Sequence, residues 1–132
     1  MTRVVLGLGC DRGAAPETLA TAVEQALALT GLPLSAVAGL ATIDKKHDEA
    51  AIRELARRHG WPLRFYTARE LAAVPVPNPS EAVLRHMGTP AVAEAAALLA
   101  AGTAADLILE KHKYCGADGK HATVSIARLH HD

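Results

Sequence analysis

The chain is poor in aromatic residues and has no net charge, and both shortages exclude classes of protein. It has 132 residues, with one Trp, two Tyr and one Phe. Proteins that bind single-stranded nucleic acid stack bases on aromatic side chains, and few are present here. Lys plus Arg equals Asp plus Glu at 14 each, so no overall basic field attracts a polyanion. We therefore expect no nucleic-acid partner, and an anionic ligand has to be recognised by a local site.

Long apolar runs and cysteine pairs are also scarce. No segment approaches the roughly 18 uninterrupted apolar residues of a membrane-spanning helix. The first residues lack the pattern of a secretory signal. The two cysteines, Cys10 and Cys115, are too few for a disulfide framework, and we interpret them as reduced thiols. We expect a cytoplasmic protein with no membrane partner.

What the chain has in quantity is small and aliphatic apolar residues. Half of it is hydrophobic, mainly Ala, Leu and Val, which is enough for the core of one domain over residues 1–132. Apolar runs predict strands, and helical spacing with Gly or Pro at the ends predicts helices. The strands are predicted at 3–9, 36–43, 62–66, 106–111 and 123–129, and the helices at 16–30, 49–59, 68–73, 80–86 and 89–101.

This order of elements predicts an α/β fold. We expect a three-layer sandwich, with a mixed, mostly parallel sheet of about five strands and helices on both faces. The last two strands are expected to form an antiparallel hairpin, joined by a loop of roughly ten polar, glycine-containing residues.

Four segments carry residues suited to a binding site, and the first follows the first strand. Gly7, Gly9 and Gly13 let a ligand approach the backbone, Cys10 lies between them, and Arg12 offers a fork for a carboxylate or phosphate. The next helix adds unpaired N–H groups. The segment is neither a P-loop nor a Gly-x-Gly-x-x-Gly motif. A tight turn with a solvated arginine is the alternative interpretation.

The second segment follows the second strand. It contains Thr42, Asp44, Lys46, Asp48 and Glu49. Ligands of open α/β sheets bind beyond the carboxyl ends of the strands, where both segments are expected. An ordinary charged turn, with Asp48 as the helix cap, explains the same residues.

The third segment contains two predicted helix starts. Asn78, Ser80 and Glu81 form one, and Gly88 with Thr89 forms the other. Helix starts offer backbone donors to anions, but capping explains these residues without a ligand.

The fourth segment runs from Lys111 to His121. His112, Cys115 and His121 are metal-capable side chains, but no Cys-x-x-Cys or His-x-x-x-His pair accompanies them. We expect a mobile polar loop here, with no metal and no cofactor.

Taken together, the segments resemble one family of cobalamin biosynthesis, formed by the C-terminal domain of CbiG proteins and the stand-alone CobE proteins. The likeness runs nearly end to end, with departures at Lys45, Glu110 and Ser125. It is carried by Gly7-x-Gly9-Cys10 with Arg12-Gly13, Ile43-Asp44 with Lys46 and Asp48-Glu49, Val76-Pro-Asn-Pro-Ser-Glu81, Gly88-Thr-Pro-x-Val-x-Glu94-Ala-Ala-Ala-Leu98, Leu109-x-Lys111 and Thr123-Val-x-Ile-Ala-Arg128.

The resemblance implies a corrin or precorrin intermediate as ligand. Such rings are flat and apolar and carry acidic side chains at the rim, so an apolar cleft with a few donors suits them. The ligand-binding candidates are Gly7, Gly9, Cys10, Arg12, Gly13, Thr42, Asp44, Lys46, Asp48, Glu49, Asn78, Ser80, Glu81, Gly88, Thr89, Glu94 and Lys111.

Four functions remain open from the sequence. CbiG-like proteins are lactone hydrolases of cobalt-precorrin-5A, and Asp44, Glu49 or Glu94 would then activate water. The likeness covers only the C-terminal domain of CbiG, however, and it is closer to CobE, whose role resembles binding or carriage in the aerobic pathway. We therefore expect a non-catalytic carrier. The alternatives are the hydrolase, a module docking on another cobalamin-pathway enzyme and, more remotely, a nucleotide- or S-adenosylmethionine-binding protein.

Overall fold

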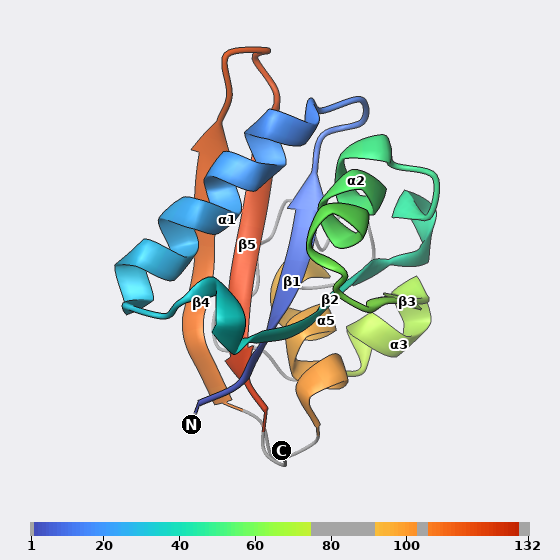
Figure 1. Cartoon of the computed structure of the whole chain (residues 1–132). Helices are drawn as coiled ribbons and strands as arrows, with labels where there is room; N and C mark the ends of the chain where they lie inside the picture. The colour runs from blue at the N-terminus through green and yellow to red at the C-terminus, as the bar shows by residue number, and fades with distance from the viewer. Residues whose placement is uncertain (1, 75–91, 103–105, 130–132) are drawn as a thin grey trace.

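A computed structural model of the chain describes residues 2–74, 92–102 and 106–129 (Figure 1). The predicted helix at 80–86 and the start of the helix at 89–101 lie outside the described residues. The elements, in chain order, are β1 (Val4–Cys10), α1 (Pro16–Thr30), η1 (Leu34–Ala36), β2 (Val37–Ile43), η2 (Asp44–Lys46), α2 (Ala50–His59), β3 (Leu63–Tyr66), α3 (Ala68–Ala72), α5 (Val92–Ala101), β4 (Asp106–Cys115) and β5 (His121–Arg128).

The strands form one mixed sheet in the order β3-β2-β1-β5-β4. β1 and β2 pair in parallel, as do β2 and β3, whereas β5 pairs antiparallel with both β1 and β4. The predicted α/β fold, with five strands and a C-terminal antiparallel pair, is confirmed. β1 is the central strand. Because β1 and β2 run parallel, their carboxyl ends lie at the same edge of the sheet.

Helices α1 and α2 cover one face of the sheet (Figure 1). α1 has the predicted bounds, because Pro16 starts it and Gly31, at φ 72°, ends it in the left-handed conformation. Its apolar side and that of α2 pack on the large aliphatic side chains of the central strands. The buried residues include Leu19, Val23, Leu27, Ile52, Leu55, Leu6, Leu8, Leu40, Val124 and Ile126.

Helices α5 and α3 cover the other face, and alanine dominates this contact. Ala95, Ala96 and Ala97 are fully buried. Small side chains let α5 lie close to β1, and the closest approach is at Gly7. A Cβ atom on Gly7 would lie 1.8 Å from the carbonyl oxygen of Ala93. Glycine at this position is therefore required by helix-to-sheet packing.

The C-terminal hairpin differs from the sequence prediction. β4 continues to Cys115, so the connection to β5 spans only residues 116–120 and the expectation of a long mobile loop was wrong. The turn is held by Asp118, whose carboxylate accepts hydrogen bonds from Ala15 N at 2.8 Å and Thr18 Oγ1 at 3.0 Å. These contacts to the start of α1 are tertiary, so strand periodicity alone did not reveal them.

No helix within the described ranges has the combination of length and apolar character needed to cross a membrane. The longest of them, α1, has 15 residues and exposes glutamate and glutamine on its outer side.

Gly7→Ala is expected to destabilise the fold, because the added methyl group collides with backbone and not with a flexible side chain. Overpacking of this kind costs about 1–3 kcal/mol, and the loss should appear as a lower urea midpoint. Gly9→Ala is the matched control, since the nearest described atom to its new Cβ is 3.9 Å away. Equal midpoints for the two variants would contradict the assigned packing.

Candidate functional site

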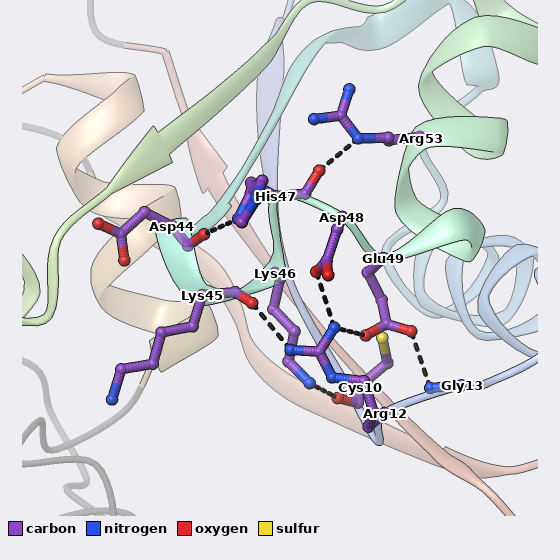
Figure 2. Close-up of polar contacts among 10 residues, drawn as sticks. All are labelled: Cys10, Arg12, Gly13, Asp44, Lys45, Lys46, His47, Asp48, Glu49 and Arg53. Atoms are coloured by element: carbon purple, nitrogen blue, oxygen red, sulfur yellow. Dashed lines mark hydrogen bonds and ion pairs between the residues drawn. The ribbon is translucent and has the colours of Figure 1, made fainter.

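The loops that follow β1 and β2 meet at the carboxyl edge of the sheet. Parallel pairing places the two strand ends side by side, and two hydrogen bonds tie them together. Thr42 Oγ1 donates to the carbonyl of Leu8 at 2.7 Å, and Lys46 Nζ donates to the carbonyl of Cys10 at 2.6 Å. Figure 2 shows the contacts around this junction. The structure thus brings together the first two candidate segments of the sequence.

Arg12 is the centre of the junction. Its Nη1 lies 2.7 Å from Asp48 Oδ1 and 3.0 Å from Glu49 Oε2, and its Nη2 donates to the carbonyl of Lys45 at 3.0 Å. The hydrogen bond from Arg12 lowers the pKa of Asp48. Asp48 therefore does not cap α2 as predicted, since its side chain bonds across to the β1–α1 loop.

Glu49 is the buried member of the group. Its side chain is 4% exposed, whereas that of Arg12 is 61% exposed. Oε1 accepts a hydrogen bond from Gly13 N at 2.8 Å, while Oε2 is in ion-pair contact with Arg12 without hydrogen-bond geometry. Gly13 has φ 79°, a conformation natural to glycine. Both carboxylate oxygens thus fix the glycine loop, which makes Glu49 a brace between the two loops.

The start of α1 is occupied by a carboxylate of the chain itself. Hydrogen bonds from Ala15 N, Lys120 N and Thr18 Oγ1 lower the pKa of Asp118. Beside it, Asp11 Oδ2 accepts from His121 N at 2.8 Å and lies 3.1 Å from its Nδ1. One backbone donor that we expected to face a ligand, Ala15 N, therefore already contacts Asp118, as does the Thr18 hydroxyl.

Glu94 and Lys111 form a second polar group, on the α5 face of the sheet. Glu94 is 1% exposed, and its Oε1 lies 3.1 Å from Lys111 Nζ on β4. Among the described residues, neither oxygen of the Glu94 carboxylate has a hydrogen-bond partner. The Lys111 ammonium is the one counter-ion of Glu94 in this part of the chain. Removing either partner would leave an uncompensated charge close to the core.

Asp44 and Cys10 differ in accessibility. Asp44 is exposed, and its side chain points away from the Arg12 group (Figure 2). Burial raises the pKa of the Cys10 thiol to about 11, against an opposing effect of Lys46. The Cys10 thiol is therefore protonated at neutral pH and is a poor nucleophile.

The remaining candidates divide into two sets. Asn78, Ser80, Glu81, Gly88 and Thr89 lie outside the described residues. Of the metal-capable residues of the hairpin, Cys115 and His121 pair directly in the β4–β5 ladder, and His121 contacts Asp11. His112 lies on the opposite face of the sheet, where it contacts Gln25 Oε1 at 2.7 Å. In the described part of the chain, no three His, Cys, Asp or Glu residues are grouped to hold a metal ion.

Sequence reasoning missed three residues beside the site. Asp118 was overlooked because its partners are about a hundred positions away. Lys113 was overlooked because residues 112–122 were assigned to a loop, and Thr123 was interpreted only as the first residue of a strand. They pair directly in the β4–β5 ladder. Residues 110–115 show no alternation of charged and apolar residues, so the sequence offered no periodic signal for a longer strand.

Glu49→Gln is expected to lower the unfolding free energy by about 1–2 kcal/mol, because the amide keeps one acceptor for Gly13 N but loses the charge facing Arg12. Urea denaturation monitored by circular dichroism measures the loss. Asp48→Asn removes an exposed partner of the same guanidinium and should have a clearly smaller effect. The role of Glu49 as a brace would be contradicted if Asp48→Asn lowered the unfolding free energy as much as Glu49→Gln.

Comparison with known proteins places the chain in one family. The sequence profile described as Cobalamin synthesis G C-terminus matches residues 4–127. Protein CobE of Sinorhizobium sp is 37% identical over 126 residues, which cover 94% of this chain and 79% of that protein. Cobalt-precorrin-5A hydrolase of Priestia megaterium is 33% identical over 129 residues, which cover 98% of this chain but 33% of the hydrolase. The chain therefore spans about a third of that enzyme.

A solved structure leads to the same family. The crystal structure of CobE, a protein from the cobalamin (vitamin B12) biosynthetic pathway, superimposes with a TM-score of 0.83 at 34% identity, covering 97% of this chain and 91% of that one. The resemblance predicted from the sequence motifs is thereby confirmed. The chain belongs to the cobalamin synthesis G C-terminal family and is a cobalamin biosynthesis protein of the CobE/CbiG type.

Proposed function

We propose that this chain holds a carboxylate-rich corrin or precorrin intermediate without transforming it. The observation that carries the proposal is the cross-braced pair of loops at the carboxyl edge of β1 and β2. Arg12 and Glu49 fix the two loops to each other through contacts within the chain. A surface fixed in advance loses little conformational freedom on binding, which favours the capture of a rigid ring.

The state of the candidate acids supports binding over chemistry. A general base has to come within hydrogen-bond distance of the proton it removes, directly or through one water. Glu49 and Glu94 are both buried and committed to Arg12 and Lys111, respectively. Asp44 is the one exposed member of the three candidates. Two of the three acids thus stabilise the loops and the sheet.

Local charge suits an acidic ring even though the chain is neutral. Lys46 brings an ammonium to the end of β1, and Arg12 keeps a largely exposed guanidinium. A ligand carboxylate competes for Arg12 with Asp48, which is equally exposed and binds it at the surface. A hydrogen bond to a charged group contributes about 1.5–3 kcal/mol. Three charge-assisted hydrogen bonds to ligand carboxylates, together with burial of the apolar ring and after subtraction of the free-energy cost of association, correspond to a Kd in roughly the micromolar range.

Titration with hydrogenobyrinic acid tests the proposal. We expect a saturable change in the visible spectrum of the ring, with a Kd in the micromolar range and an unchanged ligand mass afterwards. A ring whose acidic side chains are all amides is the matched control ligand, because it keeps the flat core without the charges, and it should bind more weakly. Absence of saturation up to about 1 mM, the limit of weak specific binding, would refute ring binding.

Hydrolysis of a ring lactone is the second candidate function. One observation favours it: the match to the Priestia hydrolase, at 33% identity, covers 98% of this chain. Asp44 would then activate the water molecule, since it is the exposed member of the three candidate acids. Incubation with cobalt-precorrin-5A distinguishes the functions. Release of acetaldehyde from the substrate with consumption of one water, absent with Asp44→Asn, would show catalysis and displace the carrier proposal.

Docking on another cobalamin-pathway enzyme is a third possibility. The Priestia hydrolase has about two thirds of its length outside the match, so a separate protein in that role is the partner this alternative requires. Co-elution of the purified chain with such enzymes would support it. Saturable ring binding by the chain alone would favour the carrier.

A further inference from the structure

Packing requires a glycine at one position of β1, Gly7, but not at another, Gly9. Gly7 is enforced by α5, as the 1.8 Å approach of Ala93 O shows. Gly9 has no positive φ, and the one described atom within 4 Å of an added Cβ would be Thr123 Cβ, at 3.9 Å. That separation is an ordinary van der Waals contact. Neither backbone conformation nor packing of the described residues therefore explains the missing side chain at Gly9.

Gly9 lies at one end of a row of three residues across neighbouring strands. It pairs with Thr123 of β5, and Thr123 pairs with Lys113 of β4. Adjacent strands lie about 4.8 Å apart, so the row spans about 10 Å of backbone. Directly opposite residues project to the same side of a sheet. The row therefore forms one continuous strip, which changes from bare backbone to hydroxyl to ammonium.

The strip lies on the α5 side of the sheet, at its carboxyl edge. Residues two apart in a strand share a face. Gly7 faces α5, so Gly9 does too, and Lys111 reaches Glu94 of α5 from the same side of β4 as Lys113. His112, between them, contacts Gln25 of α1 on the opposite face.

The strip is accessible and its polar groups are unused. Gly9 and Thr123 are half-buried, and Lys113 is exposed. Within the part of the chain that the structure describes, neither the Thr123 hydroxyl nor the Lys113 ammonium has a hydrogen bond or ion pair. Lys111, two residues earlier, is by contrast committed to the buried Glu94 carboxylate. The two lysines thus have separate tasks, one structural and one free to meet a ligand.

We infer that the strip Gly9–Thr123–Lys113 is the surface on which the flat ring rests, with the Lys113 ammonium facing one of its rim carboxylates. This inference rests on the proposed function and gives the binding surface a definite place. A bare backbone at Gly9 lets a planar molecule approach the sheet closely. The Thr123 hydroxyl serves as a hydrogen-bond donor, and the Lys113 ammonium adds a charge complementary to a rim carboxylate.

Titration of strip variants tests the inference. Hydrogenobyrinic acid and its methyl-esterified ring are the two probes, and Gly9→Val, Thr123→Val and Lys113→Gln are the variants. Gly9→Val should weaken both probes by at least about tenfold, because its side chain stands where the ring lies. Lys113→Gln should weaken the acid by about tenfold and leave the ester unchanged. Thr123→Val should weaken both by a few-fold.

Lys45→Gln is the matched control for charge. Lys45 is also an exposed lysine at this edge, but it belongs to η2 after β2 and not to the strands that form the strip (Figure 2). The Lys45→Gln variant should bind both probes with the affinity of the wild type. Thermal melting of every variant checks that the fold is retained. Should Gly9→Val unfold, Thr123→Val and Lys113→Gln still decide the matter, since both change accessible side chains.

Lysine acetylation with and without hydrogenobyrinic acid provides a second readout. Saturating ligand should slow modification of Lys113 and leave Lys45 unaffected. Wild-type binding together with unchanged Lys113→Gln affinity and unprotected Lys113 would overturn the strip and leave the carrier proposal standing. If the wild type fails to bind the ring, both proposals are overturned.

Discussion

The site depends on one buried carboxylate. Glu49 joins the backbone of the β1–α1 loop, through Gly13 N, to the guanidinium of Arg12, and it does so from the first position before α2. Without it, the glycine-containing turn after β1 and the charged turn after β2 would lose the one buried side-chain contact to the Gly13 backbone, and the exposed Arg12–Asp48 pair and the bonds of Thr42 and Lys46 to β1 would remain. Because the pair is shielded on the Glu49 side and open on the Arg12 side, the same contact can both brace the loops and leave a cation accessible to solvent.

The two faces of the sheet are built differently, and this difference shapes the molecule. The α1/α2 face is filled by leucine, isoleucine and valine, which hold the helices away from the strands at ordinary packing distance. The α5 face is filled by alanine and glycine, which bring the helix nearer to the backbone. A polar pair, Glu94 and Lys111, is enclosed in that thinner layer. Among the described residues, Gly9, Thr123 and Lys113 lie on this face at the carboxyl edge of β1.

Sequence reasoning predicted those parts of the fold that local chemistry decides. The bounds of α1 followed from Pro16 and Gly31, and the β1–β2 edge followed from the parallel arrangement of βαβ units. It failed where a side chain has a choice of partner. Asp48 is suited both to capping α2 and to binding Arg12, and the arginine, 36 positions away, is the one it binds. The extension of β4 past Lys111 also needed its partner strand, because polar residues on an edge strand look like a loop.

The position of β5 has a consequence for how the chain folds. Val4, at the start of the central strand, pairs with Arg128, close to the end of the sequence. Until β5 is made, β1 therefore has an open edge of hydrogen-bonding groups on one side, flanked by the most apolar surface of the domain. Native assembly has to await synthesis of nearly the whole chain, and such long-range pairing makes folding slow and exposes the nascent protein to self-association. In a fused relative, whatever is translated ahead of this domain has time to fold first.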